Sequence, residues 1–173
     1  MATKPSYVGT LNAIANGERG GYELFRAWSA STSDAELQKT LDMVAIREME
    51  HSWAFEKRLS ELGFDVLPPA EKNKAGAKLL KMMKSKASDT EKFAAFGIGT
   101  TPTGNAADTE PATDGLLQIL ADKTIDPQTG GLIGRFICEE RYSGRALLKA
   151  WKAFQRRQDA GKSTGKKAGK KAA

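Results

Sequence analysis

Apolar residues recur every three or four positions along two long segments of the chain, and this spacing predicts two helices. The first helix covers residues 8–29. The second begins at Ser33 and Glu36, which have the spacing of a capping box, and runs to Gly63, a residue typical of helix ends. Because only a short loop joins the two segments, we expect an antiparallel helical hairpin.

The second half of the chain repeats this plan after a long connection. Pro68 and Pro69 end the hairpin, and residues 65–109 are interpreted as a crossover with one or two short helices. A shorter helix follows over about residues 111–124, and the last helix starts at an Asp-Pro pair, residues 126–127, and frays near residue 158. The sequence therefore predicts an all-α chain, in which residues 1–159 form an antiparallel four-helix bundle with its long crossover between the second and third helices.

The positive charge of the chain is concentrated at its end. The 173 residues carry a net charge of +6, of which +5 comes from the lysines of residues 160–173, a segment without acidic residues. Such a segment is too poor in apolar residues to pack, so a disordered Lys-rich tail is predicted. These lysines favour weak binding of nucleic-acid phosphates, whereas the bundle itself is nearly neutral.

The chain contains one cysteine and one histidine. A single cysteine forms no internal disulfide, which favours a reducing compartment, and we expect the protein in the cytoplasm. No stretch approaches the 18 apolar residues of a membrane-spanning helix, so no membrane association is expected.

Three polar residues lie on the apolar faces of the first two predicted helices. Glu18 falls on the stripe of the first helix, while Glu48 and His51, three residues apart, fall on that of the second. A carboxylate or an imidazole that faces a core is unfavourable unless it is paired or binds a metal. The glycines around Glu18 indicate the close approach of a neighbouring backbone. We expect these side chains at one level of the hairpin, sharing a cation; the alternative is a buried polar network in which His51 bonds one carboxylate.

The sequence of the last predicted helix resembles that of the second over seven residues, 137–143 against 46–52. When the shared Ile, the first Glu and the Ser of the two helices are aligned, Glu139 takes the place of Glu48, and Tyr142 takes that of His51. Glu140 is interpreted as a solvent-side partner of neighbouring basic residues, and as an alternative ligand if the helix is rotated.

An acidic residue at the start of the third helix completes the pattern. Glu110 precedes Glu139 by 29 residues, much as Glu18 precedes Glu48 by 30. Because Glu110 stands directly before a proline, at the frayed start of the helix, Asp114 one turn later is the second candidate.

The chain resembles the ferritin-like, rubrerythrin-type di-iron carboxylate family in residues 15–18 with Tyr22, in residues 48–51 (EMEH) and in residues 139–142 (EERY). The resemblance implies a four-helix bundle that binds iron, with manganese and zinc as alternatives, as one or two ions. Its implied metal ligands are Glu18, Glu48, His51, Glu139 and Glu110. Tyr142 stands where the family has its second histidine, so a symmetric two-iron site is in doubt. The Cys-x-x-Cys pair of the family's rubredoxin-like domain is missing from the sequence.

The resemblance implies oxygen- or peroxide-dependent oxidation at this site, as in a di-iron oxidoreductase, a peroxidase or a ferroxidase. The alternative is a bundle of the same fold that has lost the metal and acts in binding a partner, or a nucleic acid through its basic tail. Fold alone does not decide between these two functions.

A second apolar line on the second helix, formed by Ile46, Met49 and Trp53, lies away from Glu48 and His51. A helix that is apolar on two sides must be covered on both. The crossover helix, with its Leu and Met residues, or a second subunit can cover this line, and we expect a homodimer through the first two helices.

Overall fold

The computed structural model describes residues 5–69, 73–99 and 114–169, and every regular element in these ranges is a helix. The described residues form six helices: α1 Val8–Ser31, α2 Ala35–Glu61, α3 Lys74–Met83, α4 Asp89–Ala95, α5 Asp114–Leu120 and α6 Pro127–Gly169. For this part of the chain the predicted all-α class is confirmed. None of the described helices combines the length and the apolarity needed to cross a membrane.

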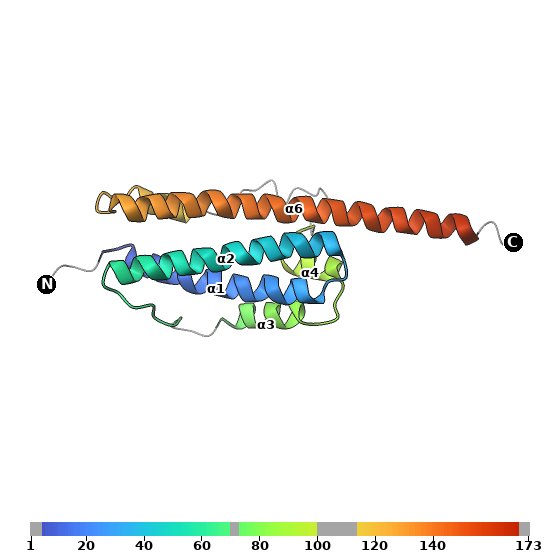
Figure 1. Ribbon diagram of the computed structural model, residues 1–173, viewed down its shortest axis with the longest axis horizontal. Coiled ribbons are helices and arrows are strands. Elements are labelled where there is room, and N and C mark those ends of the chain that lie inside the picture. Colours follow the sequence, from blue (N-terminus) through green and yellow to red (C-terminus); the bar gives the residue numbers. More distant parts are fainter. Residues whose placement is uncertain (1–4, 70–72, 100–113, 170–173) are drawn as a thin grey trace.

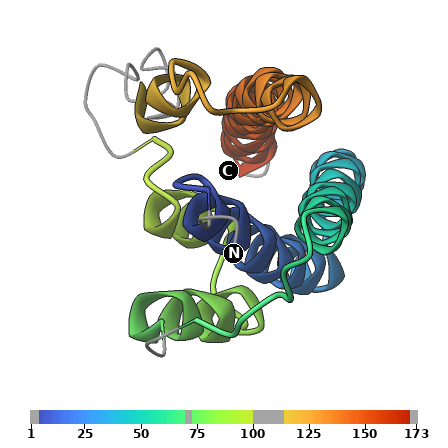
Figure 2. The same ribbon diagram turned by 90° about the vertical axis from the view of Figure 1, so that its left-hand side faces the viewer.

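Three long helices, α1, α2 and α6, run along the long axis of the molecule (Figure 1). The end-on view in Figure 2 shows α1 in the middle, with α2, α3 and α6 on different sides of it. α1 and α2 pack along their length as the predicted hairpin, and α6 packs against α2. The crossover contributes two short helices, of which α3 packs against α1.

The start of α2 lies one residue later than the capping-box spacing predicts. Asp34 is its N-cap and accepts hydrogen bonds from the backbone N–H groups of Glu36 (3.1 Å) and Leu37 (2.9 Å). The same carboxylate binds the Arg157 guanidinium of α6 at 2.7 to 2.9 Å. Asp34 therefore both begins α2 and ties it to the far end of the packed part of α6.

The third predicted helix is shorter in the structure than in the sequence analysis. α5 ends at Leu120, and the next residues form a turn, in which the Asp122 carboxylate accepts hydrogen bonds from the N–H (2.8 Å) and the hydroxyl (2.7 Å) of Thr124. This local pairing competes with continued helix, which explains the early end. Residues 111–113 lie outside the described residues.

α6 is longer than the sequence analysis predicts. It starts after the predicted Asp126 N-cap, but its backbone continues past residue 158 to Gly169. The disorder predicted for residues 160–173 stays a prediction. A helix can continue into this segment because extending an existing helix is much easier than starting one.

Buried apolar side chains form two separate clusters along the bundle. The first consists of Tyr7, Val8, Leu11, Ile14, Ala15, Phe55, Leu59, Ile133, Phe136 and Ile137. The second consists of Phe25, Trp28, Leu37, Leu41, Val44, Ala45, Met83, Phe93, Leu147 and Phe154. Between the two clusters each long helix places polar residues at buried or half-buried positions: Glu18 on α1, Glu48 and His51 on α2, and Glu140 on α6. A polar level therefore separates the two apolar cores.

A network around the Arg58 guanidinium ties α2 to the start of α6. Its Nε donates to Thr129 Oγ1 (2.8 Å), Nη2 donates to Asp126 Oδ1 (2.8 Å), and Nη1 donates to Glu61 Oε2 (3.0 Å). Asp126 also accepts from the Thr129 N–H (2.9 Å), as the N-cap of α6, and from the Tyr7 hydroxyl (3.1 Å). These five residues are called the Arg58 network below.

The second apolar line on α2 is not covered within the described part of the chain. Ile46 and Trp53 are 59% and 60% exposed, because α3 packs against α1 instead. The homodimer stays a prediction. Sedimentation of the wild type beside Trp53→Glu tests it: the dimer predicts that only the variant sediments as a monomer.

Candidate metal centre

The polar level between the two apolar clusters is built from one or two residues of each long helix. α1 contributes Glu18, α2 contributes Glu48 and His51, and α6 contributes Glu140. These four residues are called the carboxylate layer. Three carboxyl groups share one imidazole there, so the layer holds more acidic groups than a single cation can balance.

His51 is the centre of the layer and is 5% exposed. Its Nδ1 donates to Glu18 Oε2 at 3.0 Å and lies 3.5 Å from Glu140 Oε1. Its Nε2 donates to Glu139 Oε2 at 2.8 Å, and the ring packs edge-on against Phe136. The two nitrogens therefore face different surroundings: Nδ1 faces the layer, and Nε2 faces the outer carboxylate.

Glu140 brings an incompletely bonded oxygen into this buried place. Its Oε1 is buried and has no hydrogen-bond partner, although His51 Nδ1 is only 3.5 Å away. A buried carboxylate oxygen without a hydrogen bond is unfavourable, because the long ion pair with His51 replaces only part of the lost hydration. Such an atom is what a site for a cation requires.

Glu48 lies against the backbone of α1 at Gly21. A Cβ atom at Gly21 would stand 2.0 Å from Glu48 Oε2, so any other residue at this position would force the carboxyl group to move. Gly17 and Gly20 have no such neighbour within 4 Å. The predicted close approach at these glycines is thus made by a side chain, and at Gly21 alone.

The crowding of acidic groups shifts their protonation. Burial, together with the charges of Glu18 and Glu140, raises the pKa of Glu48 to about 9. Burial also raises the pKa of Glu18, against the opposing effect of its hydrogen bond with His51. Although burial lowers the pKa of His51, its contacts with Glu140, Glu18 and Glu139 raise it to about 10. The layer thus holds protons at neutral pH that balance its acidic groups.

One ligand atom each from Glu18, His51 and Glu140 lies within 4.8 Å of the other two, and this cluster can hold a metal ion. Two ligands of one transition-metal ion are at most about 4.2 Å apart, twice a bond length of about 2.1 Å. Adjustments of well under 1 Å at each side chain would close the cluster around an ion. Carboxylate oxygens with an imidazole nitrogen are a donor set that suits iron, manganese or zinc.

Glu139, the other predicted ligand among the described residues, lies outside the layer. Glu139 is on the outer side of His51, where it also accepts a hydrogen bond from Arg135 Nε at 2.9 Å. Burial opposes the effect, but the bonds with His51 and Arg135 hold the pKa of Glu139 below its usual range. Tyr142 is 54% exposed and packs under the Arg47 guanidinium, 4.6 Å from its ring centre. Glu110 lies outside the described residues.

The register of α6 explains why Glu140 rather than Glu139 faces the layer. The inward stripe of α6 runs through Ile133, Ile137, Glu140 and Leu147, and its next polar member, Ser143, is 3% exposed. The alignment on Glu139 and Tyr142 places the helix about 100° away from this register. The spacing of the buried isoleucines and Leu147 is the sequence pattern that identifies Glu140.

The sequence analysis also missed Arg47. It donates to Ser143 Oγ at 3.0 Å, and its charge opposes the rise in the pKa of Glu48. It therefore joins α2 to α6 at the edge of the layer and supplies positive charge there.

A groove of about 260 Å³ leads from the surface to the outer edge of His51. It lies between α2 and α6 and is lined by Glu50, His51, Ala54, Leu132, Arg135, Phe136 and Glu139. The groove is large enough for several water molecules or a small solute.

Comparisons of this chain with protein-family models, with curated proteins and with solved structures found no match. The family resemblance of the three motifs therefore stays a prediction, and function has to be argued from the geometry of the layer.

Proposed function

We propose that the protein binds a transition-metal ion, iron foremost, in the carboxylate layer and uses it for oxidation with dioxygen or peroxide. One observation carries the proposal: the buried carboxyl groups of Glu18 and Glu48 and the buried imidazole of His51 lie beside the half-buried Glu140, whose buried oxygen Oε1 has no hydrogen-bond partner. A cation would relieve the excess of acidic groups and satisfy that oxygen.

Glu18, Glu140 and His51 Nδ1 are the proposed ligands, with Glu48 as the additional carboxyl group held beside them by Gly21. Glu139 is a positioning residue: it accepts the Nε2 proton of His51 and so leaves Nδ1 as the nitrogen that faces the ion. Carboxylate partners of this kind are common on metal-binding histidines.

Iron held by carboxylates and an imidazole supplies one-electron chemistry with dioxygen or peroxide. The chain contributes the surroundings: apolar clusters on both sides of the layer exclude water, and the groove at His51 admits small molecules. We also propose that the long helices belong to a ferritin-like arrangement. The antiparallel pair of α1 and α2, with inward carboxylates from three long helices, supports this.

Iron retention tests the function. The purified full chain is loaded with Fe²⁺ without oxygen and desalted, and iron per chain is measured by elemental analysis. Wild type is expected to retain iron in proportion to the chain, whereas Glu18→Gln with Glu140→Gln retains none. Glu23→Gln, which changes an exposed carboxylate of α1, is the matched control and retains iron like the wild type.

Glu139→Gln separates the positioning role from ligation. It is expected to weaken iron binding about tenfold without abolishing it, as for other carboxylates that accept a hydrogen bond from a metal-binding histidine. Equal iron content in wild type and in the Glu18/Glu140 double variant contradicts the proposal, and the absence of iron from both favours the bundle that has lost its metal.

A further inference from the structure

Four basic residues of α6 form one row on the surface. Arg145, Lys149, Lys152 and Arg156 are exposed and, together with Leu148, line a shallow groove of about 310 Å³. Their spacing of four, three and four residues places them on one face of the helix. At 1.5 Å per residue the row is about 16 Å long.

Three cations of this row, Lys149, Lys152 and Arg156, differ from most others on the long helices. Arg26, Lys39 and Arg157 each pair with a carboxylate, at 2.7 Å in every case. In the described part of the chain, Lys149 and Lys152 pair with none, and neither does Arg156. Their charge is therefore available to an external anion.

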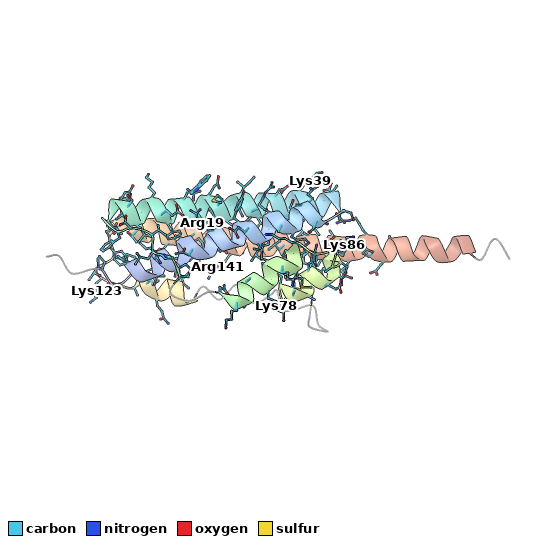
Figure 3. The ribbon with its side chains drawn as sticks, turned by 90° about the horizontal axis from the view of Figure 1, so that it is seen from below. Arg19, Lys39, Lys78, Lys86, Lys123 and Arg141 are labelled. Carbon is cyan, nitrogen blue, oxygen red and sulfur yellow. The ribbon has the colours of Figure 1, made fainter. Side chains whose placement is uncertain are left out.

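α6 carries the row outward beyond the rest of the bundle. Figure 1 and Figure 3 show the helix continuing past the ends of the other helices. Lys167 follows Arg156 by eleven residues, three helical turns, so its position on the helical backbone continues the row. The chain has no acidic residue after Asp159.

We propose that this face of α6, from Arg145 to the Lys-rich end of the helix, binds the phosphate backbone of a double-stranded nucleic acid. The inference goes beyond the proposed metal function and does not depend on it. A line of cations matches a line of phosphates, which gives binding that is largely independent of base sequence.

The composition of the row favours a duplex over other anionic partners. A helix that lies on an anionic membrane needs large apolar residues beside its cations, and the only apolar side chains after Phe154 are those of alanines. Binding of single strands relies on exposed aromatic rings that are free to stack on bases. Near the row, the Tyr142 ring already packs against the Arg47 guanidinium, and Trp151 packs against Phe93 and Phe154.

The test measures binding of a fluorescent 20-base-pair DNA duplex to the full chain by anisotropy, at 50 and 200 mM salt. In the row variant Arg145, Lys149, Lys152 and Arg156 are all changed to Gln. The matched control changes Lys74, Lys78, Lys81 and Lys84 of the α3 region, so that it removes the same charge from another surface; Lys78 and Lys86 mark this region in Figure 3. All eight side chains are exposed, and circular dichroism checks that both variants fold.

The row variant is expected to lose at least tenfold in affinity at 50 mM salt. The slope of log affinity against log salt should fall by about 3 to 4 units, since each phosphate contact contributes about 0.9. The α3 variant should change affinity by less than threefold. Equal losses in both variants, no binding by wild type at 50 mM salt, or tighter binding to phosphatidylserine vesicles than to the duplex would overturn the proposal.

Discussion

Two groups of charged residues in the described part of the chain, the Arg58 network and the carboxylate layer, are each centred on a buried cationic side chain and are built in opposite ways. In the Arg58 network one guanidinium meets Asp126, Glu61 and Thr129, and each of its three nitrogens has a partner. In the carboxylate layer one imidazole stands among several carboxyl groups, and an oxygen of Glu140 has no hydrogen bond. The first group lies at an end of the bundle, beside the N-cap of α6, and the second lies in its middle.

The difference separates a structural ion network from a candidate functional site. In the Arg58 network, folding brings opposite charges together, and the pKa of Asp126 falls because of its bonds with Thr129, Arg58 and Tyr7. In the layer, folding brings like charges together, and the pKa of Glu48 rises to about 9. A structural ion network lowers the pKa of its carboxyl groups and so favours their ionised form. A cation site without its cation raises the pKa of its carboxyl groups and so favours their neutral form. The same chemical change should therefore have opposite consequences in the two places.

Asp126→Asn is expected to have the largest effect on stability. It removes the N-cap carboxylate of α6 and leaves the largely buried Arg58 without its main partner, so the free energy of unfolding should fall by about 2 to 4 kcal/mol. Urea unfolding followed by circular dichroism measures it. Asp65→Asn, at an exposed carboxylate, is the control and should change stability by less than about 0.5 kcal/mol. If the two variants lost similar amounts of unfolding free energy, the Arg58 network would not be a stabilising ion network.

The difference in unfolding free energy between wild type and Asp126→Asn should depend on pH. Because the folded-state pKa of Asp126 is lowered, its stabilising contribution is present above the unfolded value of about 3.9 and is lost as pH falls through the folded value. The gap in unfolding free energy between wild type and Asp126→Asn should thus shrink by about 1 to 2 kcal/mol between pH 7 and pH 2.5. If this difference in unfolding free energy were the same at pH 2.5 as at pH 7, the loss in Asp126→Asn would come from altered packing or hydrogen bonding and not from the lost charge.

Glu48→Gln should change stability by less than about 1 kcal/mol at pH 7, and in the stabilising direction if it changes it at all. The raised pKa means that the buried carboxyl group is already neutral at this pH, and an amide has nearly the same shape. Thermal unfolding of Glu48→Gln, Asp126→Asn and the wild type at pH 7 measures the change in stability. A loss as large as that of Asp126→Asn would show that Glu48 is an ionised structural partner.

Gly21→Ala beside Gly20→Ala gives the smallest and most specific effect. Both changes improve helix propensity by about 0.5 to 1 kcal/mol, but only the new methyl group at Gly21 meets the Glu48 carboxyl group. Gly20→Ala should therefore raise the melting temperature and leave iron retention unchanged. Gly21→Ala should not raise the melting temperature, and it should weaken iron binding. If Gly21→Ala bound iron as well as the wild type, Glu48 would not be part of the metal site.

Much of the hairpin follows from the sequence because helix periodicity is local. The inward positions of Glu18, Glu48 and His51 follow from their place in apolar stripes, and the described structure buries all three. The start of α6 after Asp126 follows from capping chemistry in the same way. The length of α6 was predicted wrongly because composition alone identifies residues that do not pack, whereas an existing helix can still continue through them.

The partner of the histidine on α6 is the clearest case of what the sequence leaves open. Glu139 and Glu140 are neighbours in sequence and differ by about 100° around the helix, and either fits a carboxylate motif. Which one faces His51 depends on how α6 is rotated against α2, and that rotation is set by the packing of Ile133, Ile137 and Leu147. A sequence alignment of the α2 segment with the α6 segment does not reveal this rotation.

By itself the sequence determined that the chain is helical and that α1 and α2 carry acidic groups and one imidazole on their inward faces, because both follow from spacing within a single helix. The tertiary structure decided that Glu140 joins the layer, that Glu139 stands behind His51, and that Tyr142 packs on Arg47 outside it. The physical reason is that contacts between helices depend on the burial and volume of side chains far apart in the chain.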